Sequence, residues 1–215
     1  MRILLSGFEP FGGLTTNPTL ELIERAKLFN IEGIEIDTIR LPVVYQQCVP
    51  PLIAKIAEIN PDIVVCLGVA VGRASVNLER IGINVQDTVG EGKHGDNQGD
   101  HPIDRPIIND GPAGLFSTLP IRLLFEELQK MGIPTTISNT AGTYICNTTL
   151  YSLLHHIEQS SLEVEAGFIH VPATPEMVLA SPQTASMSIE TQAKAIRLII
   201  EILGKYYAVG QKSRP

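Results

Sequence analysis

Three side chains in distant parts of the chain have the types needed for covalent hydrolysis: a thiol, an imidazole and a carboxylate. Cys146 follows the run NTAGTYI, residues 139–145, at an expected strand-to-helix turn. Backbone amides and the helix dipole at such a turn stabilise a thiolate, lower its pKa and can bind an oxyanion. The alternative is an inert buried cysteine, the commoner role of this residue. Position and partners favour the nucleophile.

The imidazole and the carboxylate come from two other expected strands. His170 ends the run 166–170, so we expect it at the same sheet edge as Cys146, where a thiol needs an imidazole to take and return its proton. A structural histidine is the alternative. Glu79 lies in a mainly apolar stretch, where a carboxylate faces water or has a buried partner. It either orients His170 or is an ordinary surface or arginine-paired carboxylate, and spacing does not choose.

Charge and cysteine content limit the partners. The chain carries 16 Lys and Arg against 23 Asp and Glu, a net charge of −7, and no basic run, which argues against nucleic acid or anionic membranes. The first apolar run is too short for a signal peptide, and no stretch has membrane-spanning length. The three cysteines form no CxxC pair, which fits the reducing cytoplasm. The cysteines and histidines also lack the short spacing of zinc sites, so we predict no metal site. We expect a small or neutral partner.

Strand and helix patterns alternate along the chain. Strands are expected at residues 2–6, 34–41, 62–67, 76–85, 135–138 and 164–171, and helices after Asn17-Pro18 and at 45–59, 120–130, 144–158 and 187–203. This order predicts a three-layer α/β/α sandwich with a mostly parallel central sheet. With 44% apolar residues and no linker or repeat, residues 1–215 are expected to form a single domain.

Ligands bind beyond the carboxyl ends of the strands in such sheets. The loops 7–13, 68–72, 140–146 and 170–174 each follow an expected strand, so we expect them to converge on one crevice that holds the active site. Residues 90–99, GEGKHGDNQG, are glycine-rich and polar, which predicts a mobile loop that works as a lid.

With these residues in place, the chain resembles the pyroglutamyl peptidase I (pyrrolidone-carboxylate peptidase) family nearly end to end. The motifs that carry the resemblance are SGFEPFGG at 6–13 with Asn17-Pro18, LGVAVGR at 67–73, Glu79-Arg80, SNTAGTYICN at 138–147 and GFIHVP at 167–172. The resemblance implies a phosphorylase/hydrolase-like α/β fold and a cysteine exopeptidase that removes an N-terminal pyroglutamyl residue from peptides. It implies Cys146 as nucleophile, His170 as general base and acid, and Glu79 as the carboxylate that orients the imidazole.

The resemblance also implies a binding site and an assembly. Phe8 and Phe11 would form an apolar slot for the flat lactam ring, and the backbone at Val69 would contact the lactam, although either phenylalanine can be a plain core residue. No metal or organic cofactor is needed. The partner would be a small peptide, and the chain would form a homo-oligomer, a dimer or tetramer, with the apolar segment 172–187 as an interface.

Two positions depart from the family pattern. Val69 stands where glutamine is expected, and Asp87-Thr88-Val89 stands where the family usually has Asp-Ala-Arg, so an arginine near the oxyanion is replaced. Loss of a single oxyanion donor costs roughly 100- to 1000-fold in other enzymes. Lys93 or Arg73 is a candidate replacement if the following loop folds over the site.

These departures leave other functions open. The first alternative keeps the three catalytic groups but acts on a different cyclic amide or blocked amine. The second is a binding protein that retains the lactam slot and has lost turnover with the arginine. A nucleoside-processing enzyme of similar architecture ranks last, because fold alone does not set function and the sequence has no phosphate-cradling glycine motif.

Overall fold

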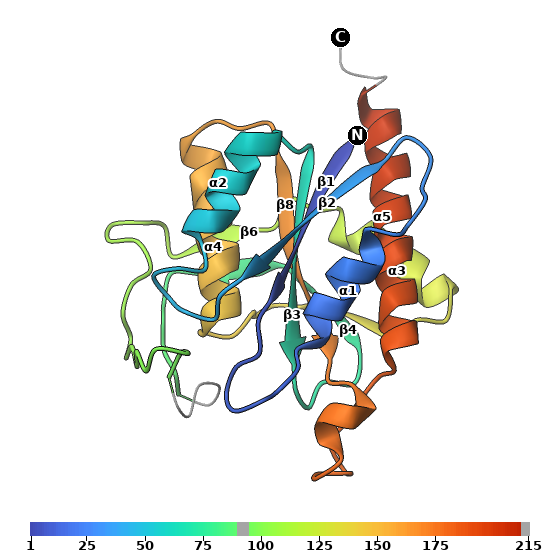
Figure 1. The fold of residues 1–215 in the computed structure, drawn as a ribbon. Coiled ribbons are helices and arrows are strands. Elements are labelled where there is room, and N and C mark those ends of the chain that lie inside the picture. The colour runs from blue at the N-terminus through green and yellow to red at the C-terminus, as the bar shows by residue number, and fades with distance from the viewer. Residues whose placement is uncertain (90–94, 212–215) are drawn as a thin grey trace.

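The computed structural model describes residues 1–89 and 95–211, and a six-stranded sheet with the order β2-β1-β3-β8-β4-β7 forms its centre (Figure 1). Helices cover both faces of this sheet, so the α/β prediction is confirmed. The strands are β1 (Arg2–Phe8), β2 (Glu35–Leu41), β3 (Ile63–Ala70), β4 (Val76–Glu79), β7 (Thr135–Ser138) and β8 (Glu165–Pro172). The helices are α1 (Pro18–Ala26), α2 (Pro50–Ile59), α3 (Ile121–Lys130), α4 (Ile145–Gln159) and α5 (Ile189–Gln211), with a short 3-10 helix η1 at Pro175–Val178.

Four neighbouring strands, β2, β1, β3 and β8, run parallel. β3 is the run IVVCLGVA, whose first seven residues are buried, as expected for a strand covered on both faces. It pairs with β1 on one side and β8 on the other. The carboxyl ends of β1, β3 and β8 therefore meet at one edge of the sheet.

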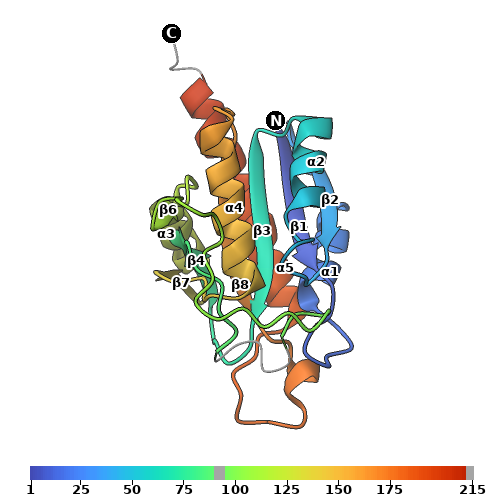
Figure 2. The same cartoon turned by 90° about the vertical axis from the view of Figure 1, so that its left-hand side faces the viewer.

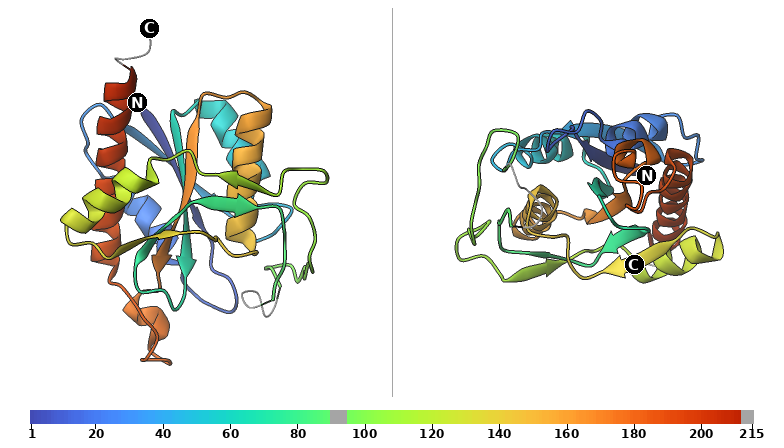
Figure 3. Two further views of the ribbon diagram at one scale, coloured as in Figure 1. Left: turned by 180° about the vertical axis from the view of Figure 1, so that it is seen from behind. Right: turned by 90° about the horizontal axis from the view of Figure 1, so that it is seen from below.

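The remaining two strands run the other way. β4 is antiparallel to β8, and β7 is parallel to β4 (Figure 3). Loop 140–146 therefore follows a strand, as expected, but the carboxyl end of that strand points away from the edge at which β1, β3 and β8 end. Only five residues, 71–75, join β3 to β4, whereas a parallel return requires a crossover of about a dozen or more. Because of this reversal, β4 places Asn77 opposite His170 and Glu79 opposite Phe168.

The stretch 76–85 was expected to be one strand, but it contains two strands that belong to different sheets. After β4, residues Ile81–Ile83 form β5, which pairs antiparallel with β6 (Gly114–Phe116), a strand that the sequence did not indicate. β5 packs closely on α4: a Cβ added at Gly82 would lie 2.9 Å from the backbone nitrogen of Tyr151. The glycine thus permits the small sheet to approach the helix.

Helix boundaries follow local capping chemistry. α1 begins as expected, with the Asn17 side chain accepting from the Thr19 amide and Pro18 in the first turn. α2 begins at Pro50 rather than at residue 45, because the paired prolines fit a first turn but not a helix interior. α5 begins after Ser188, whose hydroxyl accepts from the Thr191 amide, and continues beyond the predicted end at residue 203.

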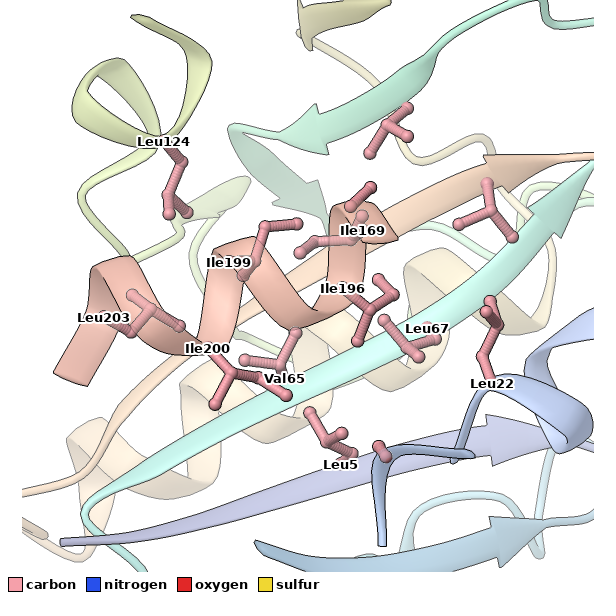
Figure 4. Packing of buried hydrophobic residues seen from close by; sticks show 14 of the residues in the cluster. Leu5, Leu22, Val65, Leu67, Leu124, Ile169, Ile196, Ile199, Ile200 and Leu203 are labelled. Carbon is pink, nitrogen blue, oxygen red and sulfur yellow. The ribbon is translucent and has the colours of Figure 1, made fainter. Parts of the chain in front are cut away.

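Two apolar cores lie on opposite faces of the sheet. One joins α1, α3 and α5 to the sheet, and Figure 4 shows side chains such as Leu5, Val65 and Ile196 interlocking there. The other joins α2 and α4 to the opposite face and contains Phe8 and Phe168. None of the helices in residues 1–89 and 95–211 has the length and apolar character to cross a membrane.

Candidate active site

The thiol of Cys146 lies against the backbone of the central strand. Cys146 is the second residue of α4, is partly buried and is not in a disulfide. A Cβ built on Gly68 of β3 would lie only 2.9 Å from its sulfur, closer than real Cβ contacts. A glycine at position 68 therefore leaves the space that the thiol occupies.

His170 flanks the same glycine from the neighbouring strand. Its register partner in β3 is Gly68, and aligned residues on adjacent strands lie about 4.8 Å apart. The ring of Phe168, two residues earlier on the same face of β8, lies 4.9 Å from the His170 ring, centroid to centroid. A Cβ on Gly68 would also lie 2.7 Å from a ring carbon of Phe168. The thiol and the phenyl ring thus meet at one small residue, and His170 stands next to that residue on the neighbouring strand.

Glu79 contacts His170 directly. Its Oε1 lies 2.8 Å from Nδ1 of His170, and its side chain is fully buried. The carboxylate reaches the imidazole diagonally across β4 and β8, since Glu79 stands opposite Phe168 and not opposite His170. When Nδ1 donates to the carboxylate, Nε2 is left as the basic atom of the ring.

Arg73 is a neighbour of this pair whose role sequence reasoning missed. Its Nη1 donates to Glu79 Oε1 at 2.8 Å and to Asn77 Oδ1 at 2.8 Å. Its Nη2 donates to the Thr140 carbonyl at 3.3 Å. Glu79 is therefore both arginine-paired and histidine-paired, and the guanidinium of Arg73, one of the two candidate oxyanion donors, is bound to this carboxylate. The sequence signal for this role was an arginine at the end of the motif LGVAVGR, six residues before a carboxylate in an apolar stretch.

The start of α4 is fixed by the residue after the nucleophile. The Asn147 amide, fully buried, donates to the carbonyls of Ile83 and Val85 and accepts from the Ile83 amide. The N-cap residue Tyr144 does not cap the helix with its side chain, since its hydroxyl donates to the Gly95 carbonyl at 2.8 Å. Burial raises the pKa of Tyr144, which keeps that hydroxyl a donor.

An aromatic group surrounds these residues. Phe8 is 3% exposed, and its ring centroid lies 6.2 Å from that of Phe168. Phe11 is half-buried and lies 6.2 Å from the ring of Tyr144. Val69, near the end of β3, is 7% exposed. The first of these phenylalanines belongs to the α4-side core, which fits its alternative as a core residue, and the second lies at the rim of that core.

Val89 and Lys93 were also named from the sequence. Val89 lies near the loop before Cys146, and Lys93 lies outside the described residues. The Thr143 hydroxyl donates to the Asp87 carbonyl at 2.9 Å, so residues 87–89 lie beside that loop, and Val89 is 80% exposed. The candidate donor Lys93 falls in 90–94 and lies outside the described residues.

The expected lid, 90–99, is described only from residue 95 onward. That part is anchored by the Asp96 carboxylate, which accepts from the amides of Tyr45 at 3.0 Å and Gln98 at 2.8 Å. The Tyr144 hydroxyl holds it from the helix side. Residues 95–99 therefore make specific hydrogen bonds to Tyr45 and Tyr144, and the expected lid function remains a prediction.

The sequence and the fold were compared with those of known proteins. The model of the pyroglutamyl peptidase family matches residues 1–206. The chain belongs to this family. A relative in Caldanaerobacter subterraneus, pyrrolidone-carboxylate peptidase 2, is 44% identical over 95% of this chain and 97% of its own. The crystal structure of the Fervidobacterium islandicum pyrrolidone carboxyl peptidase superposes with a TM-score of 0.90 at 38% identity, covering 95% of this chain and 99% of that one. Pyroglutamyl peptidase I of Bacillus amyloliquefaciens gives 0.88 at 34% identity over 94% and 96%.

Proposed function

We propose that the chain is a cysteine exopeptidase that removes an N-terminal pyroglutamyl residue from peptides through a thioester intermediate. The family match from residue 1 to 206 supports the reaction. The observation that carries the chemistry is the contact between His170 and buried Glu79 beside the glycine against which the Cys146 sulfur packs. These contacts support the assignment of Cys146 as nucleophile, His170 as base and Glu79 as orienting carboxylate, the three groups that acyl transfer requires.

In the first half of the reaction, the Cys146 thiolate attacks the carbonyl carbon that joins pyroglutamate to the next residue. His170, which holds the thiol proton at Nε2, gives that proton to the departing amine as the C–N bond breaks. The products of this half are a pyroglutamyl thioester and the shortened peptide. Glu79 stabilises the imidazolium and fixes the ring by accepting from Nδ1.

In the second half, His170 takes a proton from a water molecule, which attacks the thioester carbonyl. The C–S bond breaks, pyroglutamate leaves as a carboxylic acid, and the proton returns to the sulfur. The atoms balance with water as the only co-reactant, so the proposal requires neither metal nor organic cofactor.

Amides at the start of α4 are suited to hold the negative charge that develops on the carbonyl oxygen. The first amides of a helix have no partner within the helix, and its dipole favours an anion there. Because Asn147 ties this turn to β5, the donors are positioned before substrate arrives. We propose that these amides hold the oxyanion without the arginine that Val89 replaces in the pattern of the resembled family.

For the substrate we propose an apolar slot at Phe8, Phe11 and Val69, because a lactam is flat and uncharged. The partner is a small peptide with an N-terminal pyroglutamate. We also propose a cytoplasmic location, where the three thiols stay reduced, and a homo-oligomer, dimer or tetramer, with the segment 172–187 at an interface. Leu179 in that segment is 78% exposed.

The full-length family match favours this function over action on another cyclic amide and over lactam binding without turnover. The test is cleavage of a pyroglutamyl reporter amide by the purified chain, beside prolyl and glutaminyl reporter amides. The prolyl amide has the ring without the lactam carbonyl, and the glutaminyl amide is the open form. We expect cleavage of the pyroglutamyl amide alone, and its loss after iodoacetamide. Equal cleavage of the prolyl amide, or binding of pyroglutamate with no turnover, would reject the proposal.

A further inference from the structure

We infer that Arg73 is a positioning residue for the proposed reaction. Its guanidinium fixes the Glu79 carboxylate against His170 and connects that pair to the loop that leads to Cys146. The inference rests on the proposed function, and it assigns Arg73 a role through Glu79 and not through contact with substrate.

The guanidinium joins the turn after β3 and the start of β4 to a loop that is distant in the sequence. Arg73 itself lies in the turn after β3, and two of its acceptors, Asn77 and Glu79, lie on the reversed strand β4. The third acceptor, the Thr140 carbonyl, lies in the connection between β7 and α4, six residues before the nucleophile. One side chain thus sets the distance between the orienting carboxylate and the loop that carries the thiol.

Charge gives the contact its importance. Glu79 is fully buried, and a buried carboxylate is costly without a cation and hydrogen bonds. Arg73, whose side chain is 30% exposed, supplies both at 2.8 Å. The cation and His170 Nδ1 contact the same oxygen, Oε1, while Oε2 has no hydrogen-bond partner among the described residues. Arg73 therefore determines which carboxylate oxygen faces the imidazole, because without it either oxygen can turn toward His170.

A planar guanidinium is needed because the acceptors lie in two directions. Nη1 serves the two side chains on β4, and Nη2 serves the Thr140 carbonyl. An ammonium is a point charge with no rigid fork, so lysine can compensate the charge of Glu79 without holding the loop at the same time. Arg73→Lys is therefore the informative conservative change.

Arg80 offers a matched control. It is next to Glu79 in the sequence and is half-buried, as Arg73 is. Its Nη1 donates to Asn139 Oδ1 at 2.7 Å. Asn139 directly precedes Thr140, so Arg80 and Arg73 contact neighbouring residues of the same loop. Arg80→Met removes an arginine and a loop contact while leaving the bonds between Arg73, Glu79 and His170 in place.

The experiment compares kcat and KM of R73M, R73K and R80M on the pyroglutamyl reporter amide, together with E79Q and the double variant R73M/E79Q. We expect R73M to lower kcat by about 10- to 100-fold with little change in KM, because a displaced supporting residue disturbs the reacting geometry. R73K should lose a smaller but measurable factor, up to about tenfold, since only the charge is restored. R80M should match the wild type. In the E79Q background, R73M should change kcat little, because Arg73 acts through Glu79.

Two results for R73M would overturn the inference. A wild-type kcat for R73M, or losses that multiply in R73M/E79Q, would overturn the inference, because Arg73 would then be neutral or act by another route. If R73M does not fold, the same cycle with R73K decides: an unchanged kcat, or a loss that persists fully beside E79Q, overturns it. Failure of the wild type to cleave the reporter would instead reject the proposed function and leave these ratios undefined, so the two failures are distinct.

Discussion

Cys66 and Cys146 belong to the same face of the sheet and differ in almost every property that matters for chemistry. Cys66 lies inside β3, is fully buried, and has its pKa raised by burial to about 12. Cys48, in the same core, is also fully buried, and burial raises its pKa to about 11. Cys146 lies at the sheet edge, at the start of a helix and partly exposed. The three thiols therefore differ in burial and in their place in the fold, and the proposed nucleophile is the one that is not fully buried.

The surroundings differ in the same way. Around Cys66 the core is apolar, with side chains such as Leu4, Val64 and Phe168. At the carboxyl edge, two residues beyond Cys66 on β3, Gly68 has the Cys146 sulfur on one side and the His170 strand on the other. Substitutions in the apolar interior should therefore change the stability of the fold. Substitutions at the carboxyl edge, near Gly68, should change kcat.

The largest expected effect is on turnover when the edge thiol is removed. C146A should lower kcat on the pyroglutamyl reporter by at least about 10^4-fold, because the nucleophile is lost and only binding and oxyanion stabilisation remain. C66A, which removes a buried thiol two positions before Gly68, should keep kcat near the wild-type value and lower the melting temperature. Reporter kinetics on both variants test the contrast, and a C66A enzyme as inactive as C146A would contradict it.

The next effect concerns the orienting carboxylate. E79Q should reduce kcat by about 10^2- to 10^4-fold, because an amide beside Nδ1 can donate as well as accept and so permits the wrong tautomer. KM should change little, since the Glu79 side chain is fully buried and is not accessible to a substrate. Glu163→Gln, on the loop before β8, is the control and should leave both constants unchanged. A large rise in KM with unchanged kcat would show that position 79 acts in binding.

A smaller effect is expected from filling the space beside the thiol. G68A places a methyl group 2.9 Å from the Cys146 sulfur and 2.7 Å from the Phe168 ring, so one or both must move. We expect kcat to fall by about 10- to 100-fold. G204A is the matched control, because its added carbon meets the Ile34 side chain far from the site, and it should affect thermal stability alone. If both variants keep full kcat, the packing of the thiol on β3 is not important for catalysis.

The smallest effect is on stability at high pH. The Cys48 thiol, with a usual pKa of 9.0, has a pKa of about 11 in the folded protein, and that of Cys66 is about 12. Between pH 9 and 11 the unfolded chain therefore binds fewer protons than the folded one, and the free energy of unfolding falls as pH rises, by at most about 1.4 kcal/mol per pH unit for each thiol. Urea unfolding of wild type and C66A across this range should give a shallower slope for C66A. Equal slopes would mean that the buried thiol does not contribute.

Much of the parallel part of the fold could be predicted from local patterns. The runs that became β1, β3 and β8 are apolar and bounded by glycine or proline, and the Asn17-Pro18 cap marked a helix start. Cys146 and His170 stood out because each lies at the junction of a strand or helix with a loop. Such signals are local, since they depend on neighbours in the sequence.

The direction of β4 and β7 and the role of Arg73 could not be predicted in this way. The reversal depends on how a five-residue turn passes β8, and it is this reversal that brings Glu79 diagonally to His170. The guanidinium contacts join residues 73 and 140, whose proximity exists only once β3, β4 and β7 are assembled. From the sequence alone, both roles of Glu79 remained open, and in the structure both partners are present.

The central claim, that Cys146 is the residue that becomes acylated, can be tested by mapping the intermediate. Wild-type protein turning over the pyroglutamyl reporter is quenched in acid, digested and analysed by mass spectrometry. We predict one added pyroglutamyl group on the peptide that contains Cys146, with Cys48 and Cys66 unmodified. A pyroglutamyl group on any other side chain would contradict it.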